Sequence, residues 1–96
     1  MLLEVITPDA MLFKGNVTQV VLPGLDGSFG VLSNHAPMIS GLAAGQVKVD
    51  QVVAENQGEE NSGKYNEEHK NDTSFTFDIK GGVIEVKDNK IMVLAE

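Results

Sequence analysis

The sequence predicts an all-β protein, an antiparallel β-sandwich or flattened barrel of about 8–10 short strands with one long acidic loop. Short segments rich in β-branched and aromatic residues recur along the chain, separated by glycine, proline, asparagine or aspartate. Phe75, Phe77 and Ile79 alternate with polar residues, which is the period of two expected of a half-buried strand. No segment keeps apolar residues at the three- and four-residue spacing of a helix.

The first strands are expected before residue 23. Alternating residues over 3–7 predict a strand that ends at Pro8. A short apolar run over 11–13 ends at Gly15, and the β-branched residues of 16–22 predict the second main strand.

Residues 22–38, LPGLDGSFGVLSNHAPM, combine several turn signals with one short strand. Pro23-Gly24 suits the central positions of a type II turn, and Asp26-Gly27 marks a second turn close behind it. Apolar residues over 29–32 predict a strand, and Ser33-Asn34 begins the next turn.

The second half of the chain contains the remaining strands. Gly81-Gly82 breaks one strand from the next, and Asp88-Asn89 predicts a two-residue hairpin connection. The expected strands cover residues 38–42, 46–53, 75–80, 83–86 and 91–94.

The length of 96 residues predicts a single domain, residues 1–96, since smaller pieces would not hold a core. Residues 54–74 stand apart, because Tyr65 is their only large apolar side chain and acids, glycine and amides dominate. We predict that they form a mobile, acidic hairpin insert. The alternative is an arm that binds a basic partner.

The charge and composition exclude several classes of function. The net charge is −7, and all seven cationic residues are lysines, so the clustered cations that nucleic acid and anionic membranes require are missing. The absence of cysteine excludes disulfides and thiolate metal sites. The N-terminus does not resemble a signal peptide, and glycine and proline interrupt the one uncharged run, so a soluble protein without lipid insertion is expected.

That uncharged run extends from Gly27 to Val47. In a chain that is 22% charged, such a gap predicts either a covered surface or a core segment.

Catalytic chemistry has little support in the residues. His35 follows Ser33 by two positions, but a catalytic relay also needs a third group to orient the base, so a structural bond from His35 to a loop carbonyl is the better interpretation. Gly24, Gly27 and Gly30 have the wrong spacing for a phosphate loop and are assigned to turns. We therefore expect no enzyme activity, cofactor or specific metal site.

Three motifs carry a resemblance to a known family. They are ITPDAMLFKG at 6–15, LPGLDGSFGVLSNHAPMIS at 22–40 and DIKGGVIEVKDNKIMVLAE at 78–96. In this order they resemble the N-terminal β-sandwich domain of the epsilon subunit of the F-type ATP synthase. When the chain is aligned with the family pattern, only the 54–74 insert has no counterpart.

The resemblance implies a sandwich of roughly ten strands and a non-catalytic place in the central rotor stalk. The partners would be the gamma subunit and the c-ring, whose ion-driven rotation is coupled to ATP synthesis. By the family pattern Thr7 and the turn Asp26, Gly27 and Ser28 would face the c-ring. His35, Ala36, Pro37 and Ser40 would face gamma, and the remaining motif positions, Pro23, Gly24, Gly30, Gly81 and Gly82, would serve the turns.

Two departures from the family pattern limit what the resemblance implies. Position 28 is Ser where many members have an acid, which weakens the case for an electrostatic c-ring contact there. The sequence ends at Glu96, where the family usually continues into a C-terminal helical hairpin. Inhibition of ATP hydrolysis and ATP binding belong to that hairpin, so neither is predicted for these residues.

The resemblance also implies a peripheral subunit of a membrane-bound synthase. The lack of a targeting peptide favours the cytoplasmic face of the inner membrane of a bacterium over a plastid. The competing hypothesis is a stand-alone β-sandwich adaptor that captures a basic partner through the acidic loop. Deletion of that loop would abolish adaptor binding and spare assembly into a rotor.

Overall fold

The computed structural model describes residues 1–52 and 74–96, and these residues form strands and no helix. The strands are β1 (Leu2–Ile6), β2 (Met11–Gly24), β3 (Gly27–Leu32), β4 (Met38–Leu42), β5 (Gly45–Gln51), β6 (Ser74–Ile79), β7 (Gly82–Lys87) and β8 (Lys90–Ala95). The predicted all-β class is confirmed. Within the described ranges no helix is long and apolar enough to cross a membrane.

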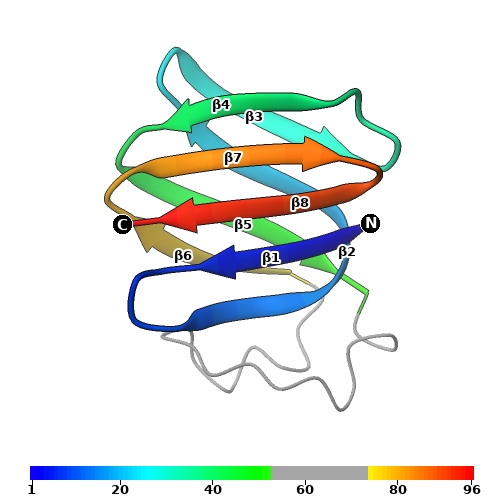
Figure 1. Ribbon diagram of the computed structural model, residues 1–96, viewed down its shortest axis with the longest axis horizontal. Coiled ribbons are helices and arrows are strands. Elements are labelled where there is room, and N and C mark those ends of the chain that lie inside the picture. The colour runs from blue at the N-terminus through cyan, green and yellow to red at the C-terminus, as the bar shows by residue number, and fades with distance from the viewer. Residues whose placement is uncertain (53–73) are drawn as a thin grey trace.

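The strands form two layers that face each other (Figure 1). One layer contains β4, β7, β8, β1 and the first half of β2, and the other contains β3, the second half of β2, β5 and β6. β1 and β8 are parallel, whereas the other pairings are antiparallel. This is the predicted flattened sandwich.

β2 belongs to both layers and corrects the prediction of two separate strands at 11–13 and 16–22. Gly15 does not end the first segment, because it is buried in the strand and pairs with Leu3. The register of β2 shifts once against β1, between Val5 and Ile6, and once against β5, beside Thr18. Such bulges bend a strand, which lets β2 pass from one layer into the other.

The predicted turn at Pro23-Gly24 is also wrong. Both residues lie in β2 and pair with Ser28 and Gly27, so the turn between β2 and β3 consists of Leu25 and Asp26 alone. Proline is tolerated here because its missing N–H would point away from β3, on the side where its carbonyl accepts a hydrogen bond from Ala43 N at 2.8 Å.

The core lies between the two layers and consists of alternate residues of nearly every strand. Its largest fully buried side chains are Phe13, Leu3, Leu22, Ile84 and Ile91. The rings of Phe13 and Phe75 lie 5.1 Å apart and tilted, which joins β2 to β6.

The C-terminal hairpin follows the sequence prediction closely. Asp88 and Asn89 form its turn, with φ of 53° and 60°, the left-handed values that a two-residue turn of this kind requires. At the other end of β7, Gly82 has a φ of 151°, and a Cβ there would lie 2.2 Å from the carbonyl oxygen of Leu94. Gly82 is thus required by both conformation and space.

The predicted acidic insert falls almost wholly outside the described residues. Ser74, its last position, already belongs to β6.

Candidate interaction surface

The ends of the strands define two opposite ends of the molecule (Figure 1). β1, β4 and β8 finish at the end that also contains Gly81 and the β2–β3 turn, which we call the hairpin end. At the opposite end, Leu2 N donates to Asn89 O, and Asn34 N donates to Asn89 Oδ1 at 2.8 Å. We call this the loop end, because it contains the β3–β4 loop.

The residues predicted to face the c-ring lie at the hairpin end. Asp26, Gly27 and Ser28 are exposed at the tip of the β2–β3 hairpin, where Gly27 has a φ of 123°. Thr7 follows β1 at the same end of the molecule, but β7 and β8 separate β1 from β4 within the layer. Its N–H and hydroxyl both bond Ala10 O, at 2.9 and 3.1 Å, so Thr7 closes the β1–β2 turn.

Most residues predicted to face gamma lie at the loop end. His35, Ala36 and Pro37 are exposed in the β3–β4 loop, and Ser40 is partly buried in the middle of β4. The Nδ1 of His35 lies 2.7 Å from Ala36 O, so Nδ1 carries the proton and donates to that carbonyl. The predicted structural bond of His35 to a loop carbonyl is therefore confirmed.

The glycines of the central motif do not all serve turns as predicted. Gly30 lies within β3 opposite Val21. Gly24 lies in β2, where a Cβ would come within 2.6 Å of Gly27 O and 2.8 Å of the Phe29 ring, so close packing explains this glycine. Gly81 lies between β6 and β7 as predicted, whereas Gly82 is already the first residue of β7 and pairs with Ala95.

The uncharged run from Gly27 to Val47 is mostly exposed rather than part of the core. Val31, Leu42 and Val47 are its only fully buried residues, whereas Leu32 and Ile39 are 58% and 74% exposed. Leu25, just before the run, is 70% exposed. Of the two predicted interpretations, the core segment is therefore excluded, and an uncharged surface remains.

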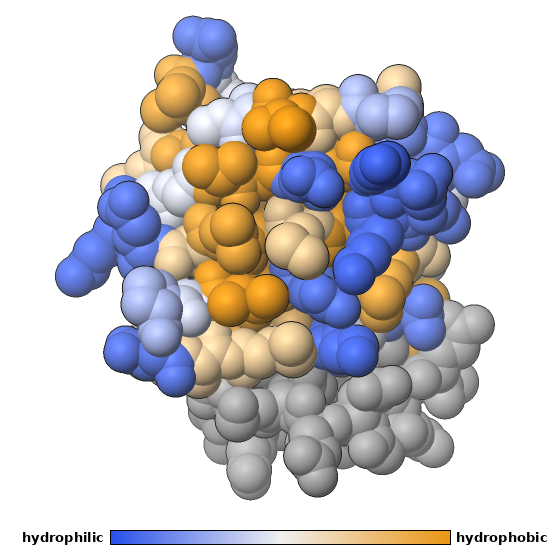
Figure 2. All heavy atoms as spheres, viewed as in Figure 1, coloured by the Kyte–Doolittle hydropathy of each residue, from blue (hydrophilic) through white to orange (hydrophobic). Residues whose placement is uncertain are grey.

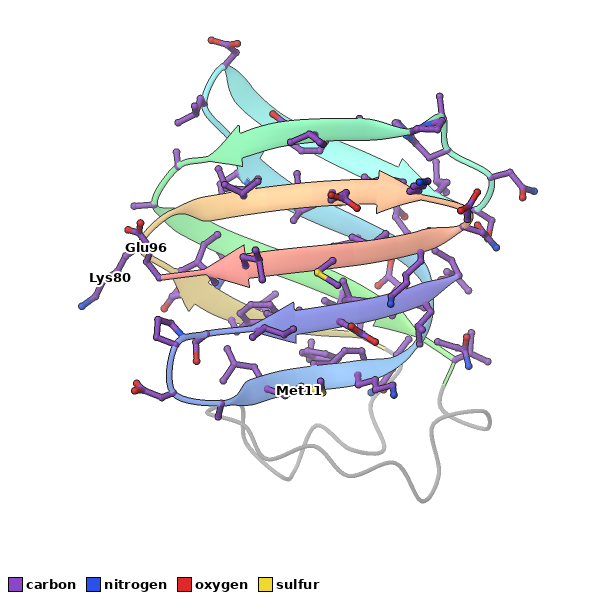
Figure 3. The ribbon with its side chains drawn as sticks, in the orientation of Figure 1. Met11, Lys80 and Glu96 are labelled. Atoms are coloured by element: carbon purple, nitrogen blue, oxygen red, sulfur yellow. The ribbon has the colours of Figure 1, made fainter. Side chains whose placement is uncertain are left out.

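An apolar row on the outer face of the β4-containing layer was not predicted. Strand register aligns Gly41 with Val83, Val83 with Leu94, Leu94 with Ile6, and Ile6 with Met11. The Leu25 side chain reaches the surface above Gly41 and lengthens the row. Figure 2 shows it as a hydrophobic band across the strands, and Figure 3 shows Met11 at its far end.

The loop-end half of the same face is polar. Lys90 Nζ lies 3.6 Å from Glu4 Oε1, and a shallow hollow of about 250 Å³ is lined by Glu85, Lys87, Asp88, Lys90 and Met92. Its two acids and two lysines balance in charge. No cluster of acidic and histidine side chains within residues 1–52 and 74–96 could hold a metal ion.

An exposed uncharged edge beside an apolar row is the kind of surface that another protein covers.

The family described as the β-sandwich domain of the ATP synthase delta/epsilon chain matches residues 1–61. The chain belongs to this family. The assignment made from the three motifs is thereby confirmed.

Relatives of the family match nearly the whole chain. The ATP synthase epsilon chain of Chlorobium limicola is 33% identical over 94 residues, which are 98% of this chain and 86% of the relative. That of Salinibacter ruber is 39% identical over 93 residues, which are 97% of this chain and 56% of the relative. That of Leptospira borgpetersenii is 34% identical, with 58% of the relative covered, so the chain spans little more than half of some relatives.

Solved structures confirm the fold. The chain resembles part of the central stalk and c-ring structure of the Tetrahymena thermophila mitochondrial ATP synthase, with a TM-score of 0.67, 16% identity, and 99% of this chain and 62% of the other covered. A chain of the Euglena gracilis mitochondrial enzyme gives a TM-score of 0.71 at 21% identity, covering 97% of this chain and 48% of the other.

Proposed function

We propose that this domain is a non-catalytic part of the central rotor stalk of an F-type ATP synthase. It links the gamma subunit to the c-ring and so helps couple proton or sodium flow to ATP synthesis. Membership of the delta/epsilon chain family is the observation that carries the proposal. We also infer that residues 1–96 form one domain, since all the described strands belong to one continuous sheet.

The geometry of the two predicted contact groups supports a linking role. The hairpin tip with Asp26 and the loop with His35 lie at opposite ends of the strands, so two partners can bind without competing for one surface. The hairpin tip would contact the c-ring, and the His35–Pro37 loop with Ser40 would contact gamma.

The apolar row supports a partner that stays bound. Val83 and Leu94 are 43% and 49% exposed, and they continue the row between Ile6 and Leu25. Burial of such side chains by a partner favours a complex, with a gross gain of about 25 cal/mol for each Å² of apolar surface before the entropy cost of association is subtracted. A lasting subunit of a larger assembly explains why this chain exposes them.

As a stalk subunit, the domain is a peripheral part of a membrane-bound complex. We propose the cytoplasmic face of a bacterial inner membrane as its location. The bacterial relatives Chlorobium limicola, Leptospira borgpetersenii and Salinibacter ruber support this choice over a plastid.

A calorimetric titration of the chain against purified gamma subunit tests the proposal. The unchanged chain should bind one-to-one, and His35→Glu should weaken binding by about tenfold, because it sets a new charge in the gamma contact. Thr76→Glu is the matched control, since Thr76 is also exposed but lies in β6. It should leave the affinity unchanged.

Two results would contradict the proposal at different levels. Equal affinities of both variants would show that the assigned gamma face is wrong. No binding by the unchanged chain, with its fold verified by circular dichroism, would overturn the stalk function itself.

A further inference from the structure

β3 is an edge strand among the described residues. It pairs with β2 from Gly27 to Leu32 without a register shift, and no other described strand pairs with it. One side of β3 therefore leaves its backbone N–H and C=O groups unpaired by any described strand.

The direction of those groups follows from two hydrogen bonds. Pro23 O accepts from Ala43 N, so the backbone of Pro23 faces away from β3, and its opposite residue Ser28 must likewise face away from β2. By alternation Gly30 and Leu32 face the same way. At the end of the strand, Leu32 O accepts from His35 N at 3.2 Å, which confirms that its carbonyl points outward.

The edge thus presents a row of backbone groups with the spacing of a strand ladder. Ser28 and Gly30 each offer an N–H and a C=O, and Leu32 offers an N–H. All three residues are exposed. Ser28 has a small side chain and Gly30 has none, so another strand can approach closely.

The edge also lacks the charges that normally protect such a strand. Proteins commonly place charged residues on exposed edges to prevent pairing with other chains. β6, which pairs only with β5 in the described part of the sheet, follows this rule, because Asp78 is exposed at its end and Lys80 follows it. β3 contains no charged residue, and the uncharged run continues from it through β4.

We infer that the free edge of β3 receives an extended strand of a partner protein, which pairs with the backbone of Ser28, Gly30 and Leu32. On the proposed function, on which this inference rests, that partner is the gamma subunit. The edge runs directly into the His35–Pro37 loop, so the strand would extend the predicted gamma contact as far as the backbone of Ser28, where gamma would adjoin the c-ring contact of Asp26 and Gly27. The exposed Leu32 side chain would contact apolar residues of the added strand.

Amide hydrogen exchange of the chain, measured by NMR with and without gamma, tests the inference. In the free chain the amides of Ser28, Gly30 and Leu32 should exchange fast, whereas those of Phe29 and Val31, which face β2, should be protected. In the complex the first three should slow by about tenfold or more, because the added strand accepts their hydrogen bonds.

A pair of variants at one position gives a second test. Gly30→Pro removes an outward N–H without touching the ladder to β2 and should weaken gamma binding by about tenfold. Gly30→Ala is the matched control, because it keeps the N–H and its Cβ meets nothing closer than 3.4 Å, the side-chain nitrogen of Gln19. It should bind like the unchanged chain.

The outcomes separate this inference from the proposed function. Binding of gamma without added protection at the three amides, or equal binding by folded Gly30→Pro and Gly30→Ala, would overturn strand addition and leave the stalk role standing. Protection that appears without gamma and rises with chain concentration would make a second copy the occupant and also overturn the inference. No binding at all would overturn both.

Discussion

The β7–β8 hairpin and β3 are both short apolar segments, but their surroundings are opposite. β7 and β8 each have a strand on both sides, and Ile84, Val86, Ile91 and Val93 are buried between the layers. β3 pairs with β2 alone in the described part of the chain, and Val31 is its one fully buried side chain. On the proposed strand addition, the β7–β8 hairpin supplies stability and β3 supplies a surface for binding.

The largest loss of stability is expected at Gly82, the first residue of the β7–β8 hairpin. Gly82→Ala forces a φ of 151° on a residue with a side chain, and its Cβ would overlap Leu94 O. We expect a loss of about 3–5 kcal/mol in the free energy of unfolding, measured in urea. Gly27→Ala, where φ is 123° but nothing lies within 4 Å of the added Cβ, should cost less. An equal cost would mean that conformation alone, without the overlap, sets the penalty.

Truncation of one large apolar side chain should reduce mainly stability in the β7–β8 hairpin and mainly gamma binding in β3. Ile84→Ala leaves a cavity in the core and should cost about 2–5 kcal/mol of unfolding free energy, while the protein that remains folded still binds gamma. Leu32→Ala, in a side chain that is 58% exposed, should cost under about 0.5 kcal/mol and weaken gamma binding. If Leu32→Ala destabilised the fold as much as Ile84→Ala, the division of roles would be wrong.

A hydrogen bond joins the β3–β4 loop to the β7–β8 turn, and its removal should cost less unfolding free energy than Gly82→Ala or Ile84→Ala. Asn89→Gly keeps the positive φ of the hairpin turn but removes the Oδ1 that accepts from Asn34 N. A loss of about 0.5–1.5 kcal/mol is expected from thermal unfolding. Faster amide exchange at Asn34 alone would accompany it, whereas faster exchange throughout β3 would show that this bond positions the whole edge.

The hairpin was predictable from sequence because its signals are local. Asp88-Asn89 tolerates left-handed values in a two-residue turn, and period-two alternation on either side of the turn sets the register. The single long β2 was not predictable, since burial and pairing of Gly15 with Leu3 override the usual meaning of a glycine in a strand. The predicted turn at Pro23-Gly24 was wrong for a similar reason. The hydrogen bond from Ala43 N to Pro23 O and the close approach of Phe29 to Gly24 hold both residues in the strand.

The sequence was enough to name candidate contact residues, but not to predict the apolar row or the outward direction of the β3 backbone. The motif residues near Asp26 and His35 could be assigned to partners by resemblance, and the absence of charge marked the segment as a surface or core. The apolar row requires the register of five strands, which no single segment encodes. The outward direction of Ser28 and Gly30 likewise depends on the pairing with β2.

If partner binding uses an uncharged surface, the affinity for gamma should depend little on salt. Calorimetric titrations of the chain against gamma would be compared at about 0.05 M and about 0.5 M salt, across which surface charge interactions are strongly screened. We expect one-to-one binding whose affinity changes by less than about threefold, because apolar and backbone contacts are little screened. Binding that weakens steeply with salt would contradict it and favour capture of a basic partner by the acidic residues of the 54–74 segment.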